Sequence, residues 1–319
     1  MRVLSGDAKP CRGTFMSDLK APVFHIIHGS FVDGYGVRTT VFLKGCPLRC
    51  VWCCNPEGQN ALPELKVSPA RCTGCGRCVP ECPVVSIEAM PKAGNLRIDR
   101  SVCNNCGRCV EVCHTGALEM FGGYMTVEEV FEIVKRDEAF YRTSGGGVTI
   151  GGGEATCHPE FTLQLLQRCR SAYIHTALDT CGHVATPTGI KALEEADLVL
   201  YDLKCLDPET HRSLTGVSNE LILANLRRLD GMGKAIIVRV PLIPGRTDSE
   251  ESLSTMATFL MQLKSVQRID LLPFHRLGKV KYEQLGREDY LECEPISAER
   301  QLAIMELFQR HGLNVQLGG

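Results

Sequence analysis

Residues 45–53 read Gly45-Cys46-Pro47-Leu48-Arg49-Cys50-Val51-Trp52-Cys53, a C-x3-C-x2-C run that follows the apolar stretch 39–43. Three thiolates at this spacing can hold three irons of a 4Fe-4S cube and leave the fourth iron open to a substrate. A tetrahedral zinc site and buried cysteines that act as small apolar side chains are the alternatives. The nearest extra thiol, Cys54, adjoins Cys53 and is poorly placed as a fourth zinc ligand. We therefore expect the chemistry at Cys46, Cys50 and Cys53.

Composition limits the class of protein. The chain has 319 residues, of which 44% are hydrophobic, and a formal net charge of −2. It can form one large domain and a small one, and it lacks the basic excess that favours nucleic acid or an anionic membrane. The 18 cysteines fall largely in C-x2-C steps, which favours a reducing, anaerobic cytoplasm over a disulfide scaffold. Residues 1–20 contain no apolar run long enough for a signal peptide or membrane span, and we expect a flexible leader there.

Two cysteine repeats follow the first motif, each with the spacing C-x2-C-x2-C-x3-C. This is the pattern of bacterial two-cluster ferredoxins, in which the last cysteine of each repeat ligates the other cluster. One 4Fe-4S cluster is therefore expected on Cys72, Cys75, Cys78 and Cys113. The other is expected on Cys103, Cys106, Cys109 and Cys82. Zinc is the weaker alternative, because paired zinc ligands are usually separated by a longer spacer.

From residue 125 onward, helical and strand patterns alternate. A capping box at Thr126-Val-Glu-Glu129 opens a first helix. Further helices are expected at 159–170, 187–196, 219–232, 249–263 and 297–311, and strands at 148–150, 174–178, 198–202, 235–240 and 269–273. With the strand before Cys46, these give six strand-helix units and hence an α/β fold with a parallel sheet. Periodicity does not decide between an open barrel and a doubly wound sheet.

Polar residues follow the expected strands, at the carboxyl edge where parallel sheets carry their sites. The glycine run that ends in Glu154 would let backbone approach a ligand, and its carboxylate would accept from an ammonium group. Two aspartates beside a lysine indicate a small cation or ligand site. Turns, N-caps and satisfied core polar groups are the alternatives. Five such strand ends together favour a ligand site: Gly152-Gly153-Glu154, Asp179-Thr180, Asp202-Leu203-Lys204, Arg239 and His275.

The order of these motifs resembles that of glycyl radical enzyme activating enzymes, a family of the radical S-adenosylmethionine (SAM) superfamily. The resemblance covers residues 22–319 and rests on Asp33-Gly-Tyr-Gly-Val-Arg38, the first cysteine motif, Gly152-Gly-Glu154, Asp179-Thr180, Asp202-Leu-Lys204, Arg239 ahead of Pro244-Gly245, and Leu272-Pro-Phe-His275. It implies a partial (β/α)6 parallel barrel formed by residues 21–59 and 123–319. A bacterial-type two-cluster ferredoxin domain would be inserted at 60–122, as in the branch of the family that carries such an insert.

The resemblance also implies roles for individual residues. Cys46, Cys50 and Cys53 would ligate the catalytic cluster, whose fourth iron binds SAM. Trp52 would pack against the adenine and His275 would contact the nucleoside. The SAM amino group would meet Gly152, Gly153 and Glu154, and its carboxylate or ribose side would face Lys204 and Arg239. Asp179, Thr180 and Asp202 would form a Na⁺ or K⁺ site. Leu203, between Asp202 and Lys204, is also expected among the cofactor-binding residues. Asp33 would lie close to the glycine that is the substrate.

The implied reaction is reductive cleavage of SAM to methionine and a 5′-deoxyadenosyl radical, which abstracts hydrogen from a glycine of a partner glycyl radical enzyme. Flavodoxin or ferredoxin is the expected electron donor. The two additional clusters could conduct electrons, dock the partner or stabilise the fold. A radical SAM enzyme for a small molecule and a pure electron carrier are the alternative functions. The remaining cysteines are expected to be free thiols: Cys11, Cys54, Cys157, Cys169, Cys181, Cys205 and Cys293.

Overall fold

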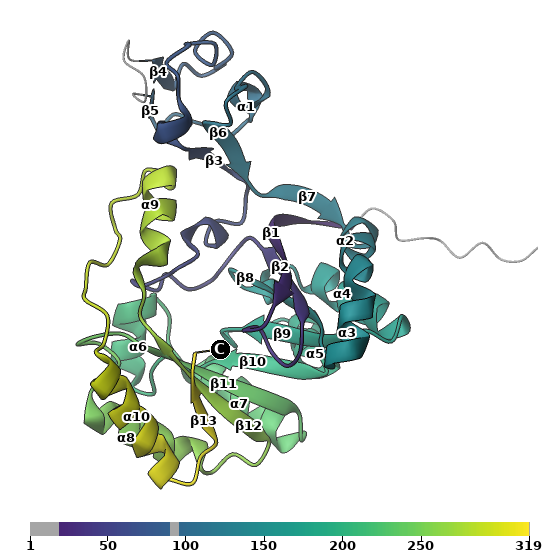
Figure 1. The fold of residues 1–319 in the computed structure, drawn as a ribbon, viewed down its shortest axis with the longest axis vertical. Helices are drawn as coiled ribbons and strands as arrows, with labels where there is room; N and C mark the ends of the chain where they lie inside the picture. Colours follow the sequence, from purple (N-terminus) through teal and green to yellow (C-terminus); the bar gives the residue numbers. More distant parts are fainter. Residues whose placement is uncertain (1–18, 90–95, 319) are drawn as a thin grey trace, which may run out of the picture.

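The computed structural model describes residues 19–89 and 96–318, and its core is a nine-stranded sheet (Figure 1). Seven strands run parallel, in the order in which they occur in the chain: β2 (Arg38–Leu43), β8 (Gly147–Gly152), β9 (His175–Thr180), β10 (Leu198–Asp202), β11 (Ala235–Leu242), β12 (Val266–Pro273) and β13 (Val315–Leu317). At the β2 edge, β1 (Lys20–Ser30) and then β7 (Gly123–Thr126) add antiparallel strands.

The strand order distinguishes the two expected sheet types. A doubly wound sheet reverses its strand order at a switch point, whereas this order runs in one direction from β2 to β13. One direction of winding is the arrangement of a barrel, and this barrel stays open because β13 pairs with β12 and not with β1 or β2. The six expected strand-helix units are present, and β1, β7 and β13 extend the sheet beyond them.

Helices cover the outer face of the half-barrel. They are α2 (Val127–Val134), α3 (Glu138–Ser144), α4 (Pro159–Ser171), α5 (Pro187–Glu195), α6 (Pro208–Thr215), α7 (Glu220–Gly231), α8 (Glu250–Leu260) and α10 (Ala298–Arg310). A further helix, α9 (Lys279–Leu285), packs instead against the start of the insert and the turn that follows the first cysteine motif. The expected capping box of Thr126 and Glu129 opens α2. Sequence periodicity missed α3, α6 and α9, which have only seven or eight residues each and few apolar positions. The main core lies between these helices and the outward side chains of the strands.

The insert projects from one end of the half-barrel (Figure 1). It contains two antiparallel ladders, β3 (Glu64–Val67) with β6 (Leu118–Phe121) and β4 (Ile87–Ala89) with β5 (Leu96–Ile98), and the short helix α1 (Arg108–Glu111). A small core of its own includes Leu65, Val67 and Leu118.

The expected leader, residues 1–20, lies mostly outside the described residues, and so does Cys11. Its last residue, Lys20, already belongs to β1. Among the helices of the described part of the chain, none combines the length and apolar character needed to cross a bilayer.

Candidate functional site

The first cysteine motif forms a loop that begins where β2 ends. Its start is tied to the next turn, because the Gly45 N–H donates to the Gly58 carbonyl at 2.8 Å. Its middle is held by the last turn of α6, where the Thr215 carbonyl accepts from the Arg49 N–H at 2.7 Å. Because carbonyls at a helix C-terminus lack partners within the helix, the last carbonyls of α6 can accept hydrogen bonds from this loop. The loop thereby receives a defined conformation around Cys46, Cys50 and Cys53.

The three thiols of this loop are free and half-buried, and Cys54 is exposed. Burial raises the pKa of Cys50 to about 11 and also raises the pKa of Cys53. A hydrogen bond with Cys181 lowers the pKa of Cys46. Metal binding displaces the thiol protons. Three free thiols on one short loop are a donor set that fits an iron-sulfur cluster with three protein ligands.

The glycine run at the end of β8 lies against this loop. The Gly153 N–H donates to the Leu43 carbonyl at 2.8 Å. A Cβ at Gly152 would lie 2.3 Å from the Leu43 nitrogen, and one at Gly153 would lie 2.2 Å from the Gly58 carbonyl oxygen. Only glycine fits such approaches, so these positions bring bare backbone next to the cysteine loop.

Glu154 connects the ends of β8 and β9. Its side chain is buried, with the residue 1% exposed. Its Oε2 accepts from the Cys181 N–H at 2.7 Å and from the Thr180 hydroxyl at 3.0 Å. Its Oε1 accepts from the Thr156 hydroxyl at 2.7 Å. These bonds place the backbone of Thr180 and Cys181 beside the glycine run.

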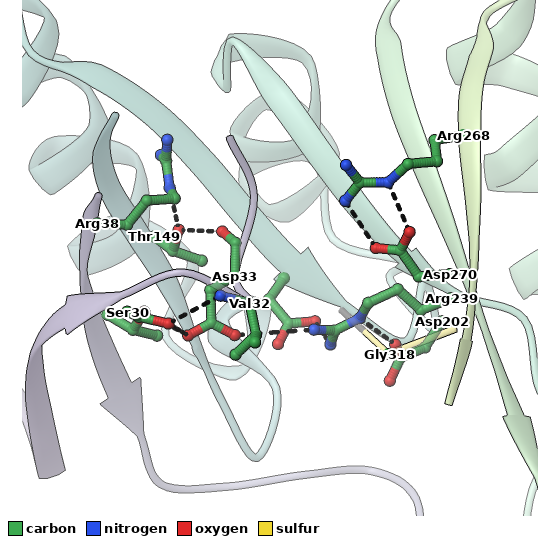
Figure 2. Close-up of polar contacts among 12 residues, drawn as sticks. Ser30, Val32, Asp33, Arg38, Thr149, Asp202, Arg239, Arg268, Asp270 and Gly318 are labelled. Atoms are coloured by element: carbon green, nitrogen blue, oxygen red, sulfur yellow. Dashed lines mark hydrogen bonds and ion pairs between the residues drawn. The ribbon is translucent and has the colours of Figure 1, made fainter. Parts of the chain in front are cut away.

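Five charged side chains form an ion-pair cluster inside the half-barrel. The Arg239 guanidinium donates through Nη2 to Asp179 and through Nε to Asp202 at 3.0 Å. Lys204 Nζ donates to the other Asp202 oxygen at 3.0 Å. Arg239 Nη1 also lies 3.9 Å from Asp33 Oδ1, and Figure 2 shows Arg239 between Asp33 and Asp202. Three carboxylates and two cations leave one formal negative charge in this cluster.

The pKa directions in this cluster follow from burial and pairing. Burial raises the pKa of Asp179 to about 7, although Arg239 opposes this shift. Burial also acts on Asp202, but Lys204 and Arg239 outweigh it and leave the Asp202 pKa below its ordinary value. The pKa values of both cations are raised by the aspartates in spite of burial. At neutral pH, Asp179 therefore lies near its midpoint, and an added positive charge would favour its ionised form.

Asp33 enters the barrel from the loop between β1 and β2. Its Oδ2 accepts from the hydroxyls of Ser30 and Thr40 at 2.7 Å each, and its backbone carbonyl accepts from the Thr149 hydroxyl at 2.7 Å (Figure 2). Arg38 is fully buried and donates from Nε to the same Thr149 hydroxyl at 2.7 Å. Burial lowers the pKa of Arg38 to about 10, against the influence of Asp33. Both ends of the Asp33 to Arg38 motif are thus built into the barrel interior.

The other predicted ligand contacts lie in different surroundings. Trp52 is half-buried in the turn of the cysteine loop. His275 is exposed at the start of the short helix η5 (Arg276–Gly278). The last residue of this helix, Gly278, packs closely on the end of the cysteine loop, because a Cβ there would lie 3.1 Å from Cys54 Cα. The Leu203 side chain is wholly buried in the main core, so only the backbone of this residue is left for the site.

In the insert, each cysteine repeat lines a cavity and receives its fourth cysteine from the other repeat. One cavity is lined by Cys72, Cys75, Cys78 and Cys113. A second cavity is lined by Cys103, Cys106, Cys109 and Cys82. Four thiols around one hollow are the donor set of a 4Fe-4S cube, so the residues present fit two such clusters.

A second ion pair inside the barrel was not expected from the sequence. Arg268 donates from Nε to Asp270 Oδ1 at 2.6 Å, and Asp270 is 1% exposed (Figure 2). The Arg268 guanidinium also lies over the Tyr35 ring, 5.2 Å from its centroid. The alternation of Arg268 and Asp270 with the core residues Ile269 and Leu271 was the signal that could have revealed this inward pair.

Comparison with known proteins gives matches over both parts of the chain. The family model described as the radical SAM superfamily matches residues 102–256, and the one described as a 4Fe-4S dicluster domain matches residues 64–114. A crystal structure of a domain of pyruvate-formate lyase-activating enzyme from Bacteroides vulgatus ATCC 8482 is 33% identical, covers 55% of this chain and 100% of that chain, and has a TM-score of 0.47.

Three similar proteins match nearly end to end. The choline trimethylamine-lyase activating enzyme of Oleidesulfovibrio alaskensis is 43% identical over 297 residues, which are 91% of this chain and 95% of the relative. The benzylsuccinate synthase activating enzyme of Thauera aromatica is 41% identical, over 91% of this chain and 90% of the relative. The trans-4-hydroxy-L-proline dehydratase activating enzyme of Clostridioides difficile is 40% identical, over 91% and 96%. With a radical SAM barrel and a two-cluster insert in one polypeptide, this chain belongs to the glycyl radical enzyme activating enzymes of the radical SAM superfamily.

Proposed function

We propose that the chain cleaves SAM to methionine and a 5′-deoxyadenosyl radical, and that this radical abstracts a hydrogen atom from a glycine of one partner glycyl radical enzyme. The observation that carries this proposal is the loop with three free thiols that follows β2. The open parallel barrel to which β2 belongs also holds the ion-pair cluster. Cys46, Cys50 and Cys53 would hold a cluster with one open iron, which would supply the electron for cleavage of the carbon–sulfur bond. The residues around it bind and orient SAM and exclude water from the radical.

The positions of the strand ends support roles for individual residues. The bare backbone of Gly152 and Gly153 lies against the cysteine loop, where it would contact the amino group of SAM, with Glu154 directly behind. The cations Lys204 and Arg239 suit the SAM carboxylate or ribose side. Trp52 and His275 would contact the nucleoside, one from the cysteine loop and one from the segment packed on it.

We propose a monovalent cation, Na⁺ or K⁺, beside Asp179, Thr180 and Asp202. The ion-pair cluster carries one more carboxylate than cations, and the SAM carboxylate would add a second negative charge. Uncompensated anions in a buried pocket are costly. A cation would offset them and hold Asp179 in its ionised form.

Three 4Fe-4S clusters would occupy the three cysteine groups, which gives about twelve irons per chain. Anaerobic reconstitution followed by iron and sulfide analysis tests this number. Replacing Cys46, Cys50 and Cys53 together with alanine should remove about four irons and all SAM cleavage, while the insert keeps its clusters. One zinc ion per repeat after reconstitution would overturn the assignment.

The electron donor is expected to be flavodoxin or ferredoxin, because the insert resembles a ferredoxin and would accept one electron at a time. The insert can conduct electrons, dock the partner or stabilise the chain. Full activity of the Cys75→Ala and Cys106→Ala variants with the natural donor would exclude conduction.

The partner is tested directly by mixing reduced protein, SAM and a glycyl radical enzyme from the same organism, without oxygen. Electron paramagnetic resonance (EPR) should show a doublet on the partner, and the doublet should collapse after exchange in deuterated water, because the coupled hydrogen belongs to a glycine. Absence of a partner radical, with deuterium transfer from a small metabolite to 5′-deoxyadenosine, would instead establish a small-molecule radical enzyme.

A further inference from the structure

Helix α9 and the residues around it connect the cysteine loop with the insert. At the beginning of α9, Lys281 Nζ donates to Asn55 Oδ1 at 2.6 Å and pairs with Glu57 at 2.7 Å, both directly after the cysteine loop. Beyond its end, Arg287 Nη2 donates to Glu64 at 3.0 Å, at the first residue of the insert ladder. In Figure 1, α9 stands between the barrel and the base of the insert. One short helix therefore contacts both cluster-bearing parts.

The β3–β6 ladder gives the insert a near end and a far end. The pair of Glu64 with Phe121 lies where the chain enters and leaves the insert, and the pair of Val67 with Leu118 lies at the other end. Leu65, one step from the near end, lines the cavity of Cys82, Cys103, Cys106 and Cys109. Leu118, at the far end, lines the cavity of Cys72, Cys75, Cys78 and Cys113. The two ladder positions are two residues apart along the strands, which corresponds to about 7 Å.

A second contact places the Cys103 repeat at the near end. A Cβ at Gly107, between Cys106 and Cys109, would lie 3.8 Å from Met120 Sδ. Met120 pairs with Leu65 in the ladder, next to the entry point of the insert. Two independent segments, one on each strand of the ladder, thus place the cavity of Cys82, Cys103, Cys106 and Cys109 closer to the barrel. We call it the near cavity, and the cavity of Cys72, Cys75, Cys78 and Cys113 the far cavity.

Arg100 joins the near cavity to α9. Its Nη1 donates to the Leu65 carbonyl at 2.5 Å, and its Nη2 donates to the Gln284 carbonyl on α9 at 3.1 Å. The Leu65 N–H in turn donates to Asn105 Oδ1 at 2.9 Å, inside the loop between Cys103 and Cys106. Burial lowers the pKa of Arg100, and Cys103 is the first group that opposes this shift. Arg100 therefore carries a positive charge beside the near thiols and holds their loop to α9.

The far cavity has a weaker connection to the same helix. Its lining residue Ala117 accepts from the Ser68 N–H at 2.7 Å, and the Ser68 hydroxyl accepts from Gln284 Nε2 at 3.4 Å. This chain of hydrogen bonds contains no charged group and ends on a long hydrogen bond between side chains. The connection through Arg100 consists of shorter hydrogen bonds from a guanidinium to backbone carbonyls.

We propose that electrons pass through the insert to the SAM cluster, and that the cluster of Cys82, Cys103, Cys106 and Cys109 is the one next to it. The cluster of Cys72, Cys75, Cys78 and Cys113 is the point at which electrons enter. Arg100 is the residue that positions the near cluster on α9. This inference rests on the three clusters of the proposed function. One electron leaves the near cluster, which is oxidised, and enters the cluster of the cysteine loop, which is reduced. The far cluster then refills the near one with an electron from a low-potential one-electron donor.

Magnetic coupling between reduced clusters tests the order, because it falls steeply with distance. The full chain is reconstituted as wild type, as Cys75→Ala and as Cys106→Ala, and the relaxation of the reduced SAM-cluster EPR signal is measured. In Cys75→Ala the signal should relax as fast as in wild type, and in Cys106→Ala it should relax slowly, like an isolated cluster. The opposite result, or equal relaxation in both variants, overturns the order.

Arg100 provides a test that leaves every cysteine in place. In Arg100→Gln, loss of a positive charge should lower the midpoint potential of the near cluster and slow reduction of the SAM cluster by the protein donor at least about tenfold. Arg100→Lys should restore the potential but not the full rate, because lysine cannot bond both carbonyls as the guanidinium does. The matched control is Arg77→Gln, since Arg77 lines the far cavity. A shift in Arg77→Gln and none in Arg100→Gln would overturn the proposal.

Iron content and SAM cleavage driven by dithionite separate this inference from the proposed function. Both should stay at wild-type values in the arginine variants, since dithionite can reduce the SAM cluster without the insert. If wild-type protein lacks about twelve irons or does not cleave SAM, the proposed function fails. If both hold and the relaxation order is reversed, the electron route alone is wrong.

Discussion

Asp33 is the one carboxylate of the ion-pair cluster that comes from outside the parallel strands. The loop that carries it also exposes Phe31 and Val32, which are 72% and 54% accessible, so it reaches both the barrel interior and the surface. In Asp33→Asn, SAM cleavage with dithionite should change less than about twofold, whereas hydrogen abstraction from the partner should fall at least about tenfold, because we propose that this loop faces the partner.

The measurement compares 5′-deoxyadenosine release with the spin formed on the partner. Asp137→Asn is the matched control, since Asp137 accepts from Thr39 and pairs with His28, a residue 51% exposed at its side chain. Equal losses of cleavage and of partner spin in Asp33→Asn would contradict a role near the substrate glycine.

Asp179 should make the cation effect depend on pH. Its pKa is raised to about 7 from an ordinary value of 3.8, so between these values the folded state keeps a proton that the unfolded chain has released. The contribution of Asp179 to the free energy of unfolding therefore falls as the pH rises to about 7. A bound cation favours the ionised carboxylate, and its benefit to SAM affinity should grow across the same interval.

Calorimetric titration of SAM in potassium and in tetramethylammonium chloride, at about pH 6 and about pH 8, measures this dependence. The potassium advantage should be larger at the higher pH in wild type and should not vary in Asp179→Asn. A wild-type advantage that is the same at both values would exclude a cation coupled to Asp179.

At the scale of elements, the end of β8 determines whether the cysteine loop can close. In Gly153→Ala, the new Cβ would lie 2.2 Å from the Gly58 carbonyl oxygen and 2.4 Å from the Gly45 carbonyl oxygen, so the loop must move. We expect loss of about four irons and of SAM cleavage, with the insert clusters retained. The matched control is Gly231→Ala at the end of α7, where a Cβ meets nothing within 4 Å. Wild-type iron content in Gly153→Ala would show that the glycine run does not shape the loop.

The strongly patterned elements were predictable from sequence. Strands β8 to β12 carry apolar runs bounded by glycine, proline or polar residues, and their positions agree with expectation to within a few residues. The antiparallel strand β1 was missed because its sequence, Lys20–Ser30, mixes apolar residues with two histidines and lies half exposed. Its hydrogen bonds with β2 and β7 stabilise it, and such tertiary pairing overrides weak local preference.

The site was predictable where motifs end strands, and less so where side chains meet across the fold. Asp179, Asp202 and Arg239 converge because adjacent parallel strands are in register, as Asp202 opposite Arg239 shows. The contact of Asp33 with this cluster depends on how an irregular loop crosses the barrel, which no periodicity encodes. The Leu203 side chain lies in the core because neighbouring residues at a strand end point to opposite faces.

At the scale of the whole molecule, sequence spacing predicted an insert but not what orients it. One contact that orients it is made by Glu64, which begins β3 and meets two cations from different parts of the barrel domain. Lys44, wholly buried at the end of β2, donates to it at 3.1 Å, and Arg287 donates to its other oxygen at 3.0 Å. A buried lysine is tolerated only with such a partner, because burial disfavours its charge.

Glu64→Gln should therefore loosen the insert from the barrel. Loss of the carboxylate leaves Lys44 buried without its ion pair, which should cost roughly 3 kcal/mol of unfolding free energy. The pKa of Lys44, already lowered by burial, should fall further, so the loss should be smaller at high pH, where the lysine is neutral. Glu119→Gln on the facing strand β6 is the control, because its partners Lys66 and Arg71 are 22% and 59% exposed at their side chains and such pairs contribute less than about 1 kcal/mol. Anaerobic thermal unfolding of the reconstituted chain measures both variants, and equal stability of the two would mean that the insert is oriented by other contacts.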